Sequence, residues 1–324
     1  MLIMKPIVFI DRRLSAEIMD YLEQHCTVKT YKPEESRSRE KLLEYIVDCE
    51  GLFTSGGYRI DEELLQVAPK LRVVSTMSVG YNHFDVAAMQ KRKVIGTHTP
   101  YVLDDTVADL AVGLMLSVGR RIAELDRLIR DGKWNGNEGR ALFGFDVHHK
   151  TIGIVGAGRI GEAILQRTVL GFNMKALYYS RTEKTHLHEK FGARYCSLEH
   201  LLAQSDYVVL MVPLTPDTKG LIGKEQLAMM KRDAILINAS RGAIVNEQDL
   251  VEALEQGIIR GAGLDVFEQE PIPKNHALLQ LPQVVMTPHI GSATKETREK
   301  MAMLAAQNLV NALLGNGPYY KIQT

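Results

Sequence analysis

Short apolar runs alternate with amphipathic stretches along the first third of the chain. The runs are rich in Val, Ile and Phe, which favours buried strands, whereas the stretches between them carry apolar residues at steps of three or four, which favours helices. The expected strands are 7–10, 28–31, 51–54, 73–76 and 94–97, and the expected helices are 14–25, 39–47, 62–68 and 84–92. Because strands that alternate with helices usually form a parallel sheet, this part is predicted to be a flavodoxin-like unit.

A second alternating series begins at Thr151. Its expected strands are 152–155, 176–179, 194–196, 207–212, 235–238, 263–266 and 284–286, its helices include 198–204, 224–231 and 247–256, and a final helix, 295–314, ends at Gly315. We therefore expect an α/β protein with two Rossmann-like domains. A flavodoxin-like substrate domain is predicted for residues 1–100 plus 294–324, if the final helix packs back on the N-terminal unit. A dinucleotide-binding domain with a parallel sheet is predicted for residues 101–293.

A long helix is expected after Pro100. Its apolar positions step mostly by three or four from Val107 to Ile129, and Gly132 is expected to end it. These positions outnumber what one face of a peripheral helix needs to bury, so the helix either bridges the domains or packs against a second subunit. We favour a homodimer, although a linker helix without a partner has the same pattern.

A glycine-rich turn follows the first strand of the second series. Gly156, Gly158 and Gly161, with Arg159 and Ile160 between them, lie after 152–155 and before a helical stretch at 159–171. Glycine allows a tight turn and a close approach to a pyrophosphate, and the helix N-terminus offers free N–H groups. This context predicts a dinucleotide-binding turn.

The next strand ends at a position that usually holds an Asp or Glu for the ribose hydroxyls of NAD. Ser180 stands there, followed by Arg181 and Thr182. Two hydroxyls and a guanidinium suit the 2′-phosphate of NADP, which a carboxylate would repel. We expect NADP(H) to be preferred and NAD(H) to be possible.

Composition narrows the class of partner. The 324 residues include 39 Lys plus Arg and 39 Asp plus Glu, so neither nucleic acid nor an anionic membrane is an expected partner. Cys26, Cys49 and Cys196 lie far apart without a CxxC pair, which argues against a disulfide framework and a zinc site, and no metal is expected. A small-molecule ligand and a cytoplasmic location fit best.

Two apolar segments have some of the character of targeting or membrane signals. Residues 1–10 contain Lys5 and Pro6 and lack a small-residue cleavage site, so we expect a first strand rather than a signal peptide. Residues 110–119 are far shorter than the ~20 residues that a membrane span needs. No membrane association is expected.

Three ionisable residues follow late strands of the second series. Arg241 comes after 235–238, Glu270 after 263–266 and His289 after 284–286. Ligands of open α/β sheets bind at the carboxyl ends of the strands, so these side chains are expected to converge on one site. A single histidine there would mean little, but a complementary set of three indicates catalysis.

The chain also resembles the D-isomer-specific 2-hydroxyacid dehydrogenases over nearly its whole length. The matching segments are 78–81, 84–85, 106–109, 156–161, 238–242, 263–271 and 288–293. Within the family it is most similar to bacterial glyoxylate/hydroxypyruvate reductases that also reduce 2-ketogluconate, judging by 146–151 and 267–271. The resemblance implies an NADPH-preferring reduction of small 2-keto acids to D-2-hydroxy acids.

The resemblance assigns a role to each of the three residues. His289 is expected to donate the proton, since an imidazole gives and takes protons near neutral pH. Glu270 is expected to hydrogen-bond the other ring nitrogen and to favour the imidazolium. Arg241 is expected to polarise the ketone and to bind the substrate carboxylate, with the backbone N–H groups of Val79 and Gly80 completing the substrate pocket.

The expected cofactor-binding set extends beyond the glycine turn. The resemblance places Asp265 near the nicotinamide. The full set is Thr106, Gly156, Gly158, Arg159, Ile160, Gly161, Ser180, Arg181, Thr182, Val212, Pro213, Thr218, Ala239, Ser240, Asp265 and Gly291.

Two alternatives stay open on the sequence. A non-catalytic, dinucleotide-sensing interaction protein is one, but no long tail or charged tract supplies a partner surface. An NAD-dependent dehydrogenase of another 2-hydroxy acid is the other, because substrate length depends on side chains such as Tyr81 and Trp134. Formate dehydrogenases of this architecture carry Gln where Glu270 stands, so Glu270 argues against that reaction.

Overall fold

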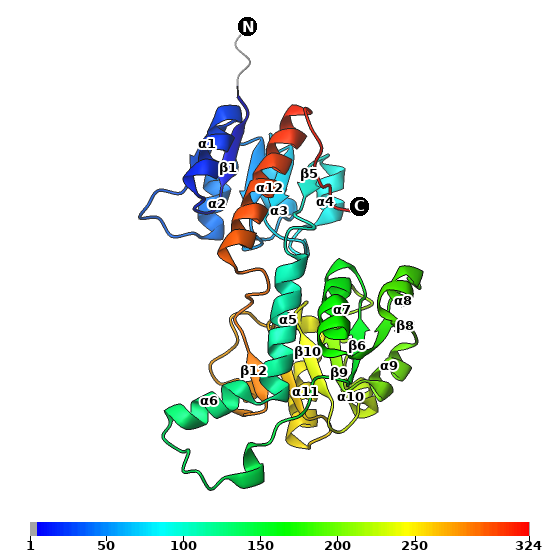
Figure 1. Cartoon of the computed structure of the whole chain (residues 1–324). Coiled ribbons are helices and arrows are strands. Elements are labelled where there is room, and N and C mark those ends of the chain that lie inside the picture. The colour runs from blue at the N-terminus through cyan, green and yellow to red at the C-terminus, as the bar shows by residue number, and fades with distance from the viewer. Residues whose placement is uncertain (1–4, 324) are drawn as a thin grey trace. The chain divides into compact units, whose positions relative to one another are not determined.

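The computed structural model describes residues 5–323, so the first part of the predicted N-terminal strand segment lies outside the described residues. The chain divides into two compact units (Figure 1). Unit 1 contains the residues up to Leu103 and those from Thr294 onward, and unit 2 contains Asp104–Ala293. Each unit has a parallel sheet of its own, which confirms the predicted fold class. The assignment of substrate binding to unit 1 stays a prediction.

Unit 1 is built on a five-stranded sheet of order β2-β1-β3-β4-β5, which is the flavodoxin-like order. The strands are β1 (Ile7–Ile10), β2 (Thr27–Thr30), β3 (Gly51–Thr54), β4 (Val73–Thr76) and β5 (Ile95–Thr97). The helices are α1 (Ala16–His25), α2 (Arg39–Ile46), α3 (Glu62–Val67), α4 (Val86–Lys91) and α12 (Lys295–Leu314). The predicted elements are all present, with boundaries that differ by one or two residues.

The final helix belongs to unit 1. α12 packs on β3, β4 and β5 beside α1 and buries Met301, Ala305 and Leu309 against them. On the sheet's other face, α2, α3 and α4 cover a core that includes Leu52. Gly315 ends α12 in the left-handed conformation, as expected. Both ends of the described chain therefore contribute to the same core.

Unit 2 is built on a seven-stranded parallel sheet of order β12-β11-β10-β9-β6-β7-β8. Its strands are β6 (Thr151–Val155), β7 (Lys175–Tyr179), β8 (Arg194–Tyr195), β9 (Tyr207–Leu210), β10 (Ile235–Asn238), β11 (Gly261–Leu264) and β12 (Val284–Met286). The order reverses between β6 and β9, where open α/β sheets bind ligands at the carboxyl ends of their strands. β11 begins and ends two residues earlier than predicted, so Asp265 follows the strand rather than belonging to it.

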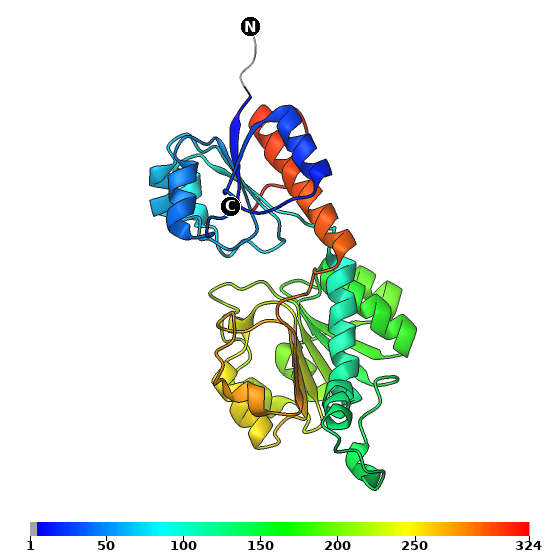
Figure 2. The ribbon, with the colours of Figure 1, turned by 90° about the vertical axis from the view of Figure 1, so that its left-hand side faces the viewer.

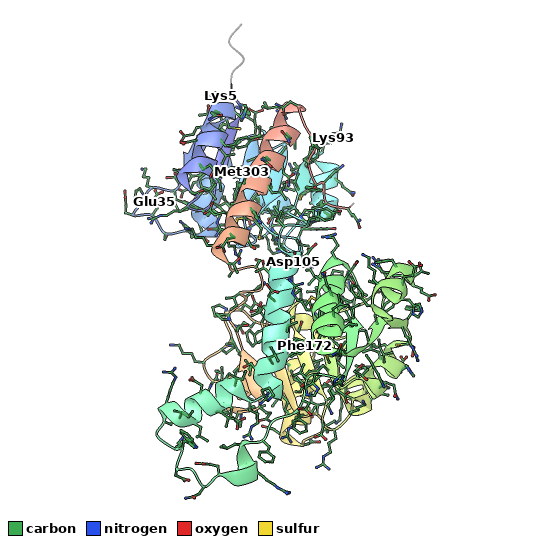
Figure 3. All side chains as sticks on the ribbon, viewed as in Figure 1. Lys5, Glu35, Lys93, Asp105, Phe172 and Met303 are labelled. Atoms are coloured by element: carbon green, nitrogen blue, oxygen red, sulfur yellow. The ribbon has the colours of Figure 1, made fainter. Side chains whose placement is uncertain are left out.

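Helices cover both faces of this sheet, and Figure 2 shows the long helix α5 along one of them. The helices are α5 (Asp104–Gly119), α6 (Ile122–Arg130), α7 (Arg159–Phe172), α8 (Thr185–Phe191), α9 (Leu198–Gln204), α10 (Lys224–Met229) and α11 (Glu247–Glu255). α5, α7 and α8 enclose one core, and α9, α10 and α11 enclose the other. Short 3₁₀ turns cover η1 (Gly139–Leu142), η2 (Gly242–Ile244) and η3 (Ala277–Gln280). Asp105, labelled in Figure 3 near the start of α5, is an exposed charged residue.

The prediction of one continuous helix through 107–129 is wrong. The chain leaves α5 at Gly119, and Arg121 takes a left-handed conformation with φ +57° before α6 begins. The Arg121 side chain holds this break, because it pairs with Glu124 at 2.6 Å and donates to the carbonyl oxygens of Ala141 and Phe143. Gly132 follows α6 at φ +67° and turns the chain, as expected.

The break separates two kinds of apolar surface. The apolar residues of α5, among them Val107, Leu114 and Met115, are buried within unit 2 against β10, β11 and α7. They therefore do not form the surplus surface that the sequence suggested for a partner. α6 has none of its described residues buried, and Ile122 and Ile129 are more than half exposed.

Candidate active site

The glycine turn after β6 has room only for glycine at two positions. Gly156 lies at φ +99°, and a Cβ atom there would stand 2.6 Å from the Met211 backbone. A Cβ atom on Gly161 would stand 2.7 Å from the carbonyl oxygen of Gly156. Gly158 is the N-cap of α7, and a Cβ atom there would meet no described atom within 4 Å.

This turn fits a pyrophosphate. The open side of Gly158 leaves the backbone accessible, and the first turn of α7 directs the N–H groups of Arg159, Ile160 and Gly161 along the helix axis, where a helix has no internal acceptor for them. The Arg159 Nε donates to the Asp104 carboxylate at 3.0 Å, which ties the start of α7 to the start of α5, where Thr106 lies.

The segment after β7 contains the residues predicted to select the cofactor. The Ser180 hydroxyl donates to the carbonyl oxygen of Thr182 at 2.6 Å, and the Tyr195 hydroxyl donates to the carbonyl oxygen of Ser180 at 3.2 Å. Arg181 is exposed, and within residues 5–323 it forms no ion pair. The turn is thus fixed by its own hydrogen bonds, while a cationic side chain extends from it.

The loop after β9 lies against the glycine turn. The Val212 side chain is one of the groups that a Cβ atom on Gly156 would strike. Thr218 closes this loop, because its hydroxyl donates to the carbonyl oxygen of Pro213 at 2.6 Å and accepts from the N–H of Thr215 at 2.8 Å. β9 ends at Leu210, so Val212 lies in the loop rather than in the predicted strand.

Asn238, the last residue of β10, shapes the turn that presents Arg241. Its buried amide donates to the carbonyl oxygen of Arg241 at 2.9 Å and accepts from the N–H and the hydroxyl of Ser240 at 3.1 and 2.9 Å. Ala239 is the residue between Asn238 and Ser240 in this turn. The Arg241 guanidinium donates to the carbonyl oxygen of Ser240 at 2.6 Å. Asn238 was not among the site residues predicted from the sequence, although an Asn at the end of a strand, followed by Ala-Ser-Arg-Gly, favours such a turn.

The loops after β10 and β11 touch through their backbones. A Cβ atom on Gly242 would collide with the carbonyl group of Phe267 and the nitrogen of Glu268. Glycine therefore lets the loop that carries Arg241 approach the loop that carries Glu270. The two charges are close enough that Arg241 contributes to lowering the pKa of Glu270.

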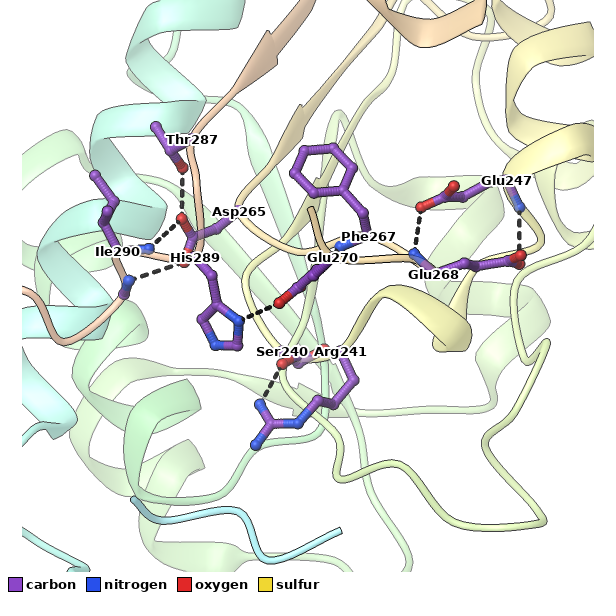
Figure 4. Close-up of polar contacts among 11 residues, drawn as sticks. Ser240, Arg241, Glu247, Asp265, Phe267, Glu268, Glu270, Thr287, His289 and Ile290 are labelled. Atoms are coloured by element: carbon purple, nitrogen blue, oxygen red, sulfur yellow. Dashed lines mark hydrogen bonds and ion pairs between the residues drawn. The ribbon is translucent and has the colours of Figure 1, made fainter. Parts of the chain in front are cut away.

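His289 and Glu270 form a hydrogen-bonded pair (Figure 4). The Nδ1 of His289 lies 2.7 Å from Glu270 Oε2, and Glu270 Oε1 accepts from the N–H of Phe267 at 3.1 Å. His289 has φ +53°, in the left-handed region that glycine adopts readily and that other residues, mainly Asn, Asp and His, adopt less often. Backbone strain of this kind is found more often at functional sites than elsewhere.

Burial and neighbouring charges act on the pair in opposite directions. Burial by itself raises the pKa of Glu270, but the hydrogen bonds from His289 and Phe267 and the charges of His289 and Arg241 outweigh it and lower the pKa below its ordinary value. Burial lowers the pKa of Arg241, and the charge of Glu270 opposes this. Glu270 is therefore an anion at neutral pH, beside two groups that favour negative charge.

Asp265 holds the loop that carries His289. Its carboxylate is 1% exposed and accepts from the Thr287 hydroxyl at 2.6 Å and from the N–H groups of Ile290 and Gly291, each at 2.8 Å. The backbone N–H of His289 donates to the carbonyl oxygen of Asp265 at 2.9 Å. The predicted place of Asp265 beside a nicotinamide stays a prediction, whereas its role in bracing this loop is directly visible.

Val79 and Gly80 belong to unit 1, in the loop that follows β4. The Ser78 hydroxyl donates to the carbonyl oxygen of Gly80 at 2.6 Å, and His98 Nδ1 lies 3.0 Å from the carbonyl oxygen of Val79. Within unit 2 the structure brings Arg241, Glu270 and His289 together. The substrate contacts of Val79 and Gly80 stay a prediction.

A cavity of about 380 Å³ in unit 2 does not coincide with this cluster. It is lined by residues that precede β10, β11 and β12, such as Asp233, Arg260 and Gln283. It therefore opens at the amino ends of the strands, whereas the three predicted catalytic residues follow the carboxyl ends. The cavity and the three predicted catalytic residues thus lie at opposite ends of the strands.

Neither a metal site nor a membrane span is found in the described part of the chain. No cluster of three or more His, Cys, Asp or Glu side chains there has the arrangement of a metal site. Among the described helices none has the length and the apolar character that crossing a membrane requires.

Comparisons with known proteins identify the family. The sequence model of the D-isomer specific 2-hydroxyacid dehydrogenase NAD binding domain matches residues 112–291. A glyoxylate/hydroxypyruvate reductase B from Yersinia pestis bv. Antiqua (strain Nepal516) is 49% identical over 96% of this chain and 95% of its own length.

Two solved structures are similar over nearly the whole chain. A protein from Thermus thermophilus has a TM-score of 0.90 at 40% identity, covering 98% of this chain and all of that one. An NADPH-dependent glyoxylate/hydroxypyruvate reductase from Sinorhizobium meliloti, solved with NADP and malonate, has a TM-score of 0.83 at 30% identity, covering 98% of this chain and 97% of that one.

The fold and the site define an NAD(P)-dependent oxidoreductase. The chain belongs to the D-isomer-specific 2-hydroxyacid dehydrogenases. It is an enzyme that uses a nicotinamide dinucleotide and acts on small 2-keto or 2-hydroxy acids.

The lowered pKa of Glu270 predicts a pH-dependent contribution to stability. A carboxyl group whose pKa is lower in the folded than in the unfolded protein stabilises the fold above its ordinary pKa, here 4.5, and loses this effect as the pH falls through the lowered value. We expect wild type to be more stable than Glu270→Gln near pH 7, and the difference in Tm to shrink below about pH 4.5. The effect is small, because 37% of the side chain is exposed and salt screens its charge.

Thermal unfolding of both proteins across this pH range measures the difference. Glu255→Gln, an exposed change on α11, is the matched control and should show no such trend. A Tm difference between wild type and Glu270→Gln that stays constant with pH would contradict the assignment.

Proposed function

We propose that this enzyme uses NADPH to reduce glyoxylate and hydroxypyruvate, and also 2-ketogluconate, to 2-hydroxy acids, which have the D configuration where C2 is a stereocentre. The similarity to glyoxylate/hydroxypyruvate reductases, at 49% identity in one case, supports the first two substrates. The single observation that carries the chemistry is the His289–Glu270 hydrogen bond of 2.7 Å next to the Arg241 loop. It combines a proton donor, an anion that holds it and a cation at one edge of the sheet.

His289 would donate the proton in this reaction. When bound, the reduced nicotinamide supplies a hydride to the carbonyl carbon of the 2-keto acid. Nδ1 of His289 faces Glu270, so Nε2 is the ring nitrogen that can transfer a proton to the carbonyl oxygen. The products are the 2-hydroxy acid, the oxidised nicotinamide and a neutral imidazole, which takes up a proton from solvent before the next cycle. Glu270 keeps the ring oriented throughout and is its anionic partner while the ring is protonated.

Arg241 would bind the substrate before and during this step. Its planar guanidinium presents donors in the geometry of a carboxylate, and its charge persists at any working pH. The same charge polarises the ketone and stabilises negative charge that develops on its oxygen. The turn held by Asn238 limits where this side chain can reach, which reduces the entropy lost on binding.

Replacement of Arg241 and His289 tests this mechanism. We expect Arg241→Ala to lower kcat/KM for glyoxylate about a hundredfold or more, since a preorganised donor to the developing oxyanion is lost. His289→Gln should abolish reduction while NADPH binding, followed by its fluorescence, is retained. The control Arg232→Ala removes an exposed guanidinium that precedes β10 and should leave activity unchanged.

Two outcomes would argue against the proposal. Near-wild-type kcat/KM in Arg241→Ala would exclude Arg241 from the mechanism. If the wild-type protein turned over none of a panel of small 2-keto acids with either cofactor, a dinucleotide-sensing role without catalysis would be favoured instead.

The preference for NADPH would come from the segment after β7. Arg181 is exposed, and Ser180 and Thr182 flank it with hydroxyls where NAD-specific relatives of the fold place a carboxylate. The similar reductase from Sinorhizobium meliloti is NADPH-dependent at 30% identity. NADH would be a poorer cofactor, because nothing in this segment attracts its ribose hydroxyls as an Asp or Glu would.

Arg181→Ala tests the preference. A charge-assisted hydrogen bond contributes about 1.5–3 kcal/mol, so kcat/KM with NADPH should fall roughly tenfold to a hundredfold. The value with NADH should hardly change, because NADH has no 2′-phosphate. The same Arg232→Ala control should affect neither cofactor. A wild-type protein with higher kcat/KM for NADH than for NADPH would refute the preference itself.

The enzyme would act as a cytoplasmic homodimer. Ile122 and Ile129 of α6 and Trp134 and Phe143 of the following segment are each more than half exposed, and a second copy of the chain is the occupant we infer for this surface. Burying large apolar side chains against their equivalents is the usual basis of a stable dimer.

Sedimentation measures this directly. The wild-type protein should sediment with twice the mass of the 36.3 kDa chain, and an Ile122→Glu, Ile129→Glu double variant should sediment with the mass of one. Leu170→Glu, an equally exposed change on α7, is the control and should not alter the mass. A wild-type monomer at micromolar concentration would overturn the inference.

A further inference from the structure

Glu247 is a buried acidic residue that the proposed mechanism does not use. It is the first residue of α11 and is only 8% exposed. Acidic side chains are rarely buried to this extent unless polar partners compensate for the lost water. The partners of Glu247 therefore indicate what it does.

Both carboxylate oxygens of Glu247 contact the loop that follows β11. Oε1 accepts a hydrogen bond from the N–H of Glu268 at 2.6 Å, and Oε2 lies 3.2 Å from Nε2 of His276 (Figure 4 shows the Glu268 contact). The backbone N–H of Glu247 in turn donates to Glu268 Oε1 at 3.3 Å. One carboxylate thus holds the loop at two points that are far apart along it.

His276 is oriented to serve as the second point. Its Nδ1 accepts a hydrogen bond from the N–H of Leu278 at 3.3 Å and so caps η3. Because Nδ1 is the acceptor, the ring proton of the neutral imidazole lies on Nε2, where it can be donated to Glu247. Leu278 is fully buried in the core, so this end of the loop is anchored in unit 2.

Glu270 lies between the two points. The consecutive N–H groups of Phe267 and Glu268 donate to two different carboxylates, that of Glu270 at 3.1 Å and that of Glu247 at 2.6 Å. A shift of this backbone on loss of Glu247 would move a donor to Glu270. Glu270 would then lose its alignment with His289.

Electrostatic contributions act on Glu247 in opposite directions. Burial and the nearby carboxylates of Glu268 and Glu270 raise the pKa of Glu247 above its ordinary value, and the N–H of Glu268 and the nearby His276 oppose this change only in part. The N-terminus of α11 adds a favourable interaction with a negative charge in the first helical turn.

We propose that Glu247 is a positioning residue for the reduction, because its carboxylate fastens both ends of the loop that orients Glu270 against His289. Glu247 touches none of the reacting groups and acts through Glu270. The inference rests on the function proposed for Glu270 and His289.

A double-mutant cycle between Glu247→Ala and Glu270→Gln tests it. Glu247→Ala should lower kcat for glyoxylate reduction roughly tenfold to a hundredfold, as expected for a misaligned catalytic group, with little change in the KM for NADPH. In the Glu270→Gln background the same replacement should have almost no further effect on kcat, since the residue through which it acts is already altered. Glu255→Ala, also on α11 but exposed, is the matched control and should leave kcat unchanged.

Further variants separate positioning from simple stability. Glu247→Gln keeps one acceptor for the Glu268 N–H but cannot accept from both partners, so its kcat should lie between those of wild type and Glu247→Ala. Activity is to be measured at a temperature where unfolding curves show every variant to be folded. Glu247→Asp replaces Glu247→Ala in the cycle if the latter does not fold.

The outcomes distinguish the two proposals. If Glu270→Gln alone keeps wild-type kcat, the role of Glu270 in catalysis fails. If Glu270→Gln lowers kcat and the Glu247 replacement lowers kcat by the same factor in that background as in wild type, Glu247 does not act through Glu270. In that case only the present inference fails. Wild-type kcat in Glu247→Ala also overturns it.

Discussion

The buried carboxylate of Asp265 is the constraint on which the candidate site depends. It lies just after β11 and accepts three hydrogen bonds from the Thr287–Gly291 segment, which follows the neighbouring strand β12. Three donors compensate for the cost of burying a charge and leave the segment little freedom. His289 stands in this segment at φ +53°, a conformation that an unbraced loop would seldom keep. Loss of these bonds would release the imidazole from its place beside Glu270.

The other two loops are braced in different ways. The Arg241 turn is closed by the Asn238 amide, and Gly242 lets it lie directly on the backbone of Phe267 and Glu268. Each of the three catalytic candidates thus stands on irregular backbone that polar contacts hold against a rigid parallel sheet. This arrangement suits an enzyme. The parallel sheet brings the carboxyl ends of the strands together, and the polar contacts fix the orientation of each side chain.

The sequence predicted those features whose causes are local. The strand, glycine turn and helix at 152–172 could be predicted because the conformational preferences of neighbouring residues agree there. The convergence of the three site residues followed from the parallel pairing of the strands. The break between α5 and α6 could not be read, because the helical spacing of apolar residues continues across it. What causes the break is the contact of Arg121 with carbonyl groups at 141 and 143. Glu247 was missed for the same reason, since an acidic residue at a helix start has a sufficient local explanation and its partners, Glu268 and His276, lie more than twenty residues away.

The contacts of Glu270 explain why a carboxylate stands at this position. Oε1 accepts from the N–H of Phe267 and Oε2 from His289, so both oxygens must be acceptors. A glutamine has only one acceptor oxygen and would lose one of these bonds, and it would also lose the charge that faces Arg241 and His289. The hydrogen bonds fix the direction of the imidazole, and the charge provides an anionic partner for the ring while it carries the proton to be transferred. A reaction that transfers a proton together with a hydride needs both, whereas one that transfers only a hydride needs neither.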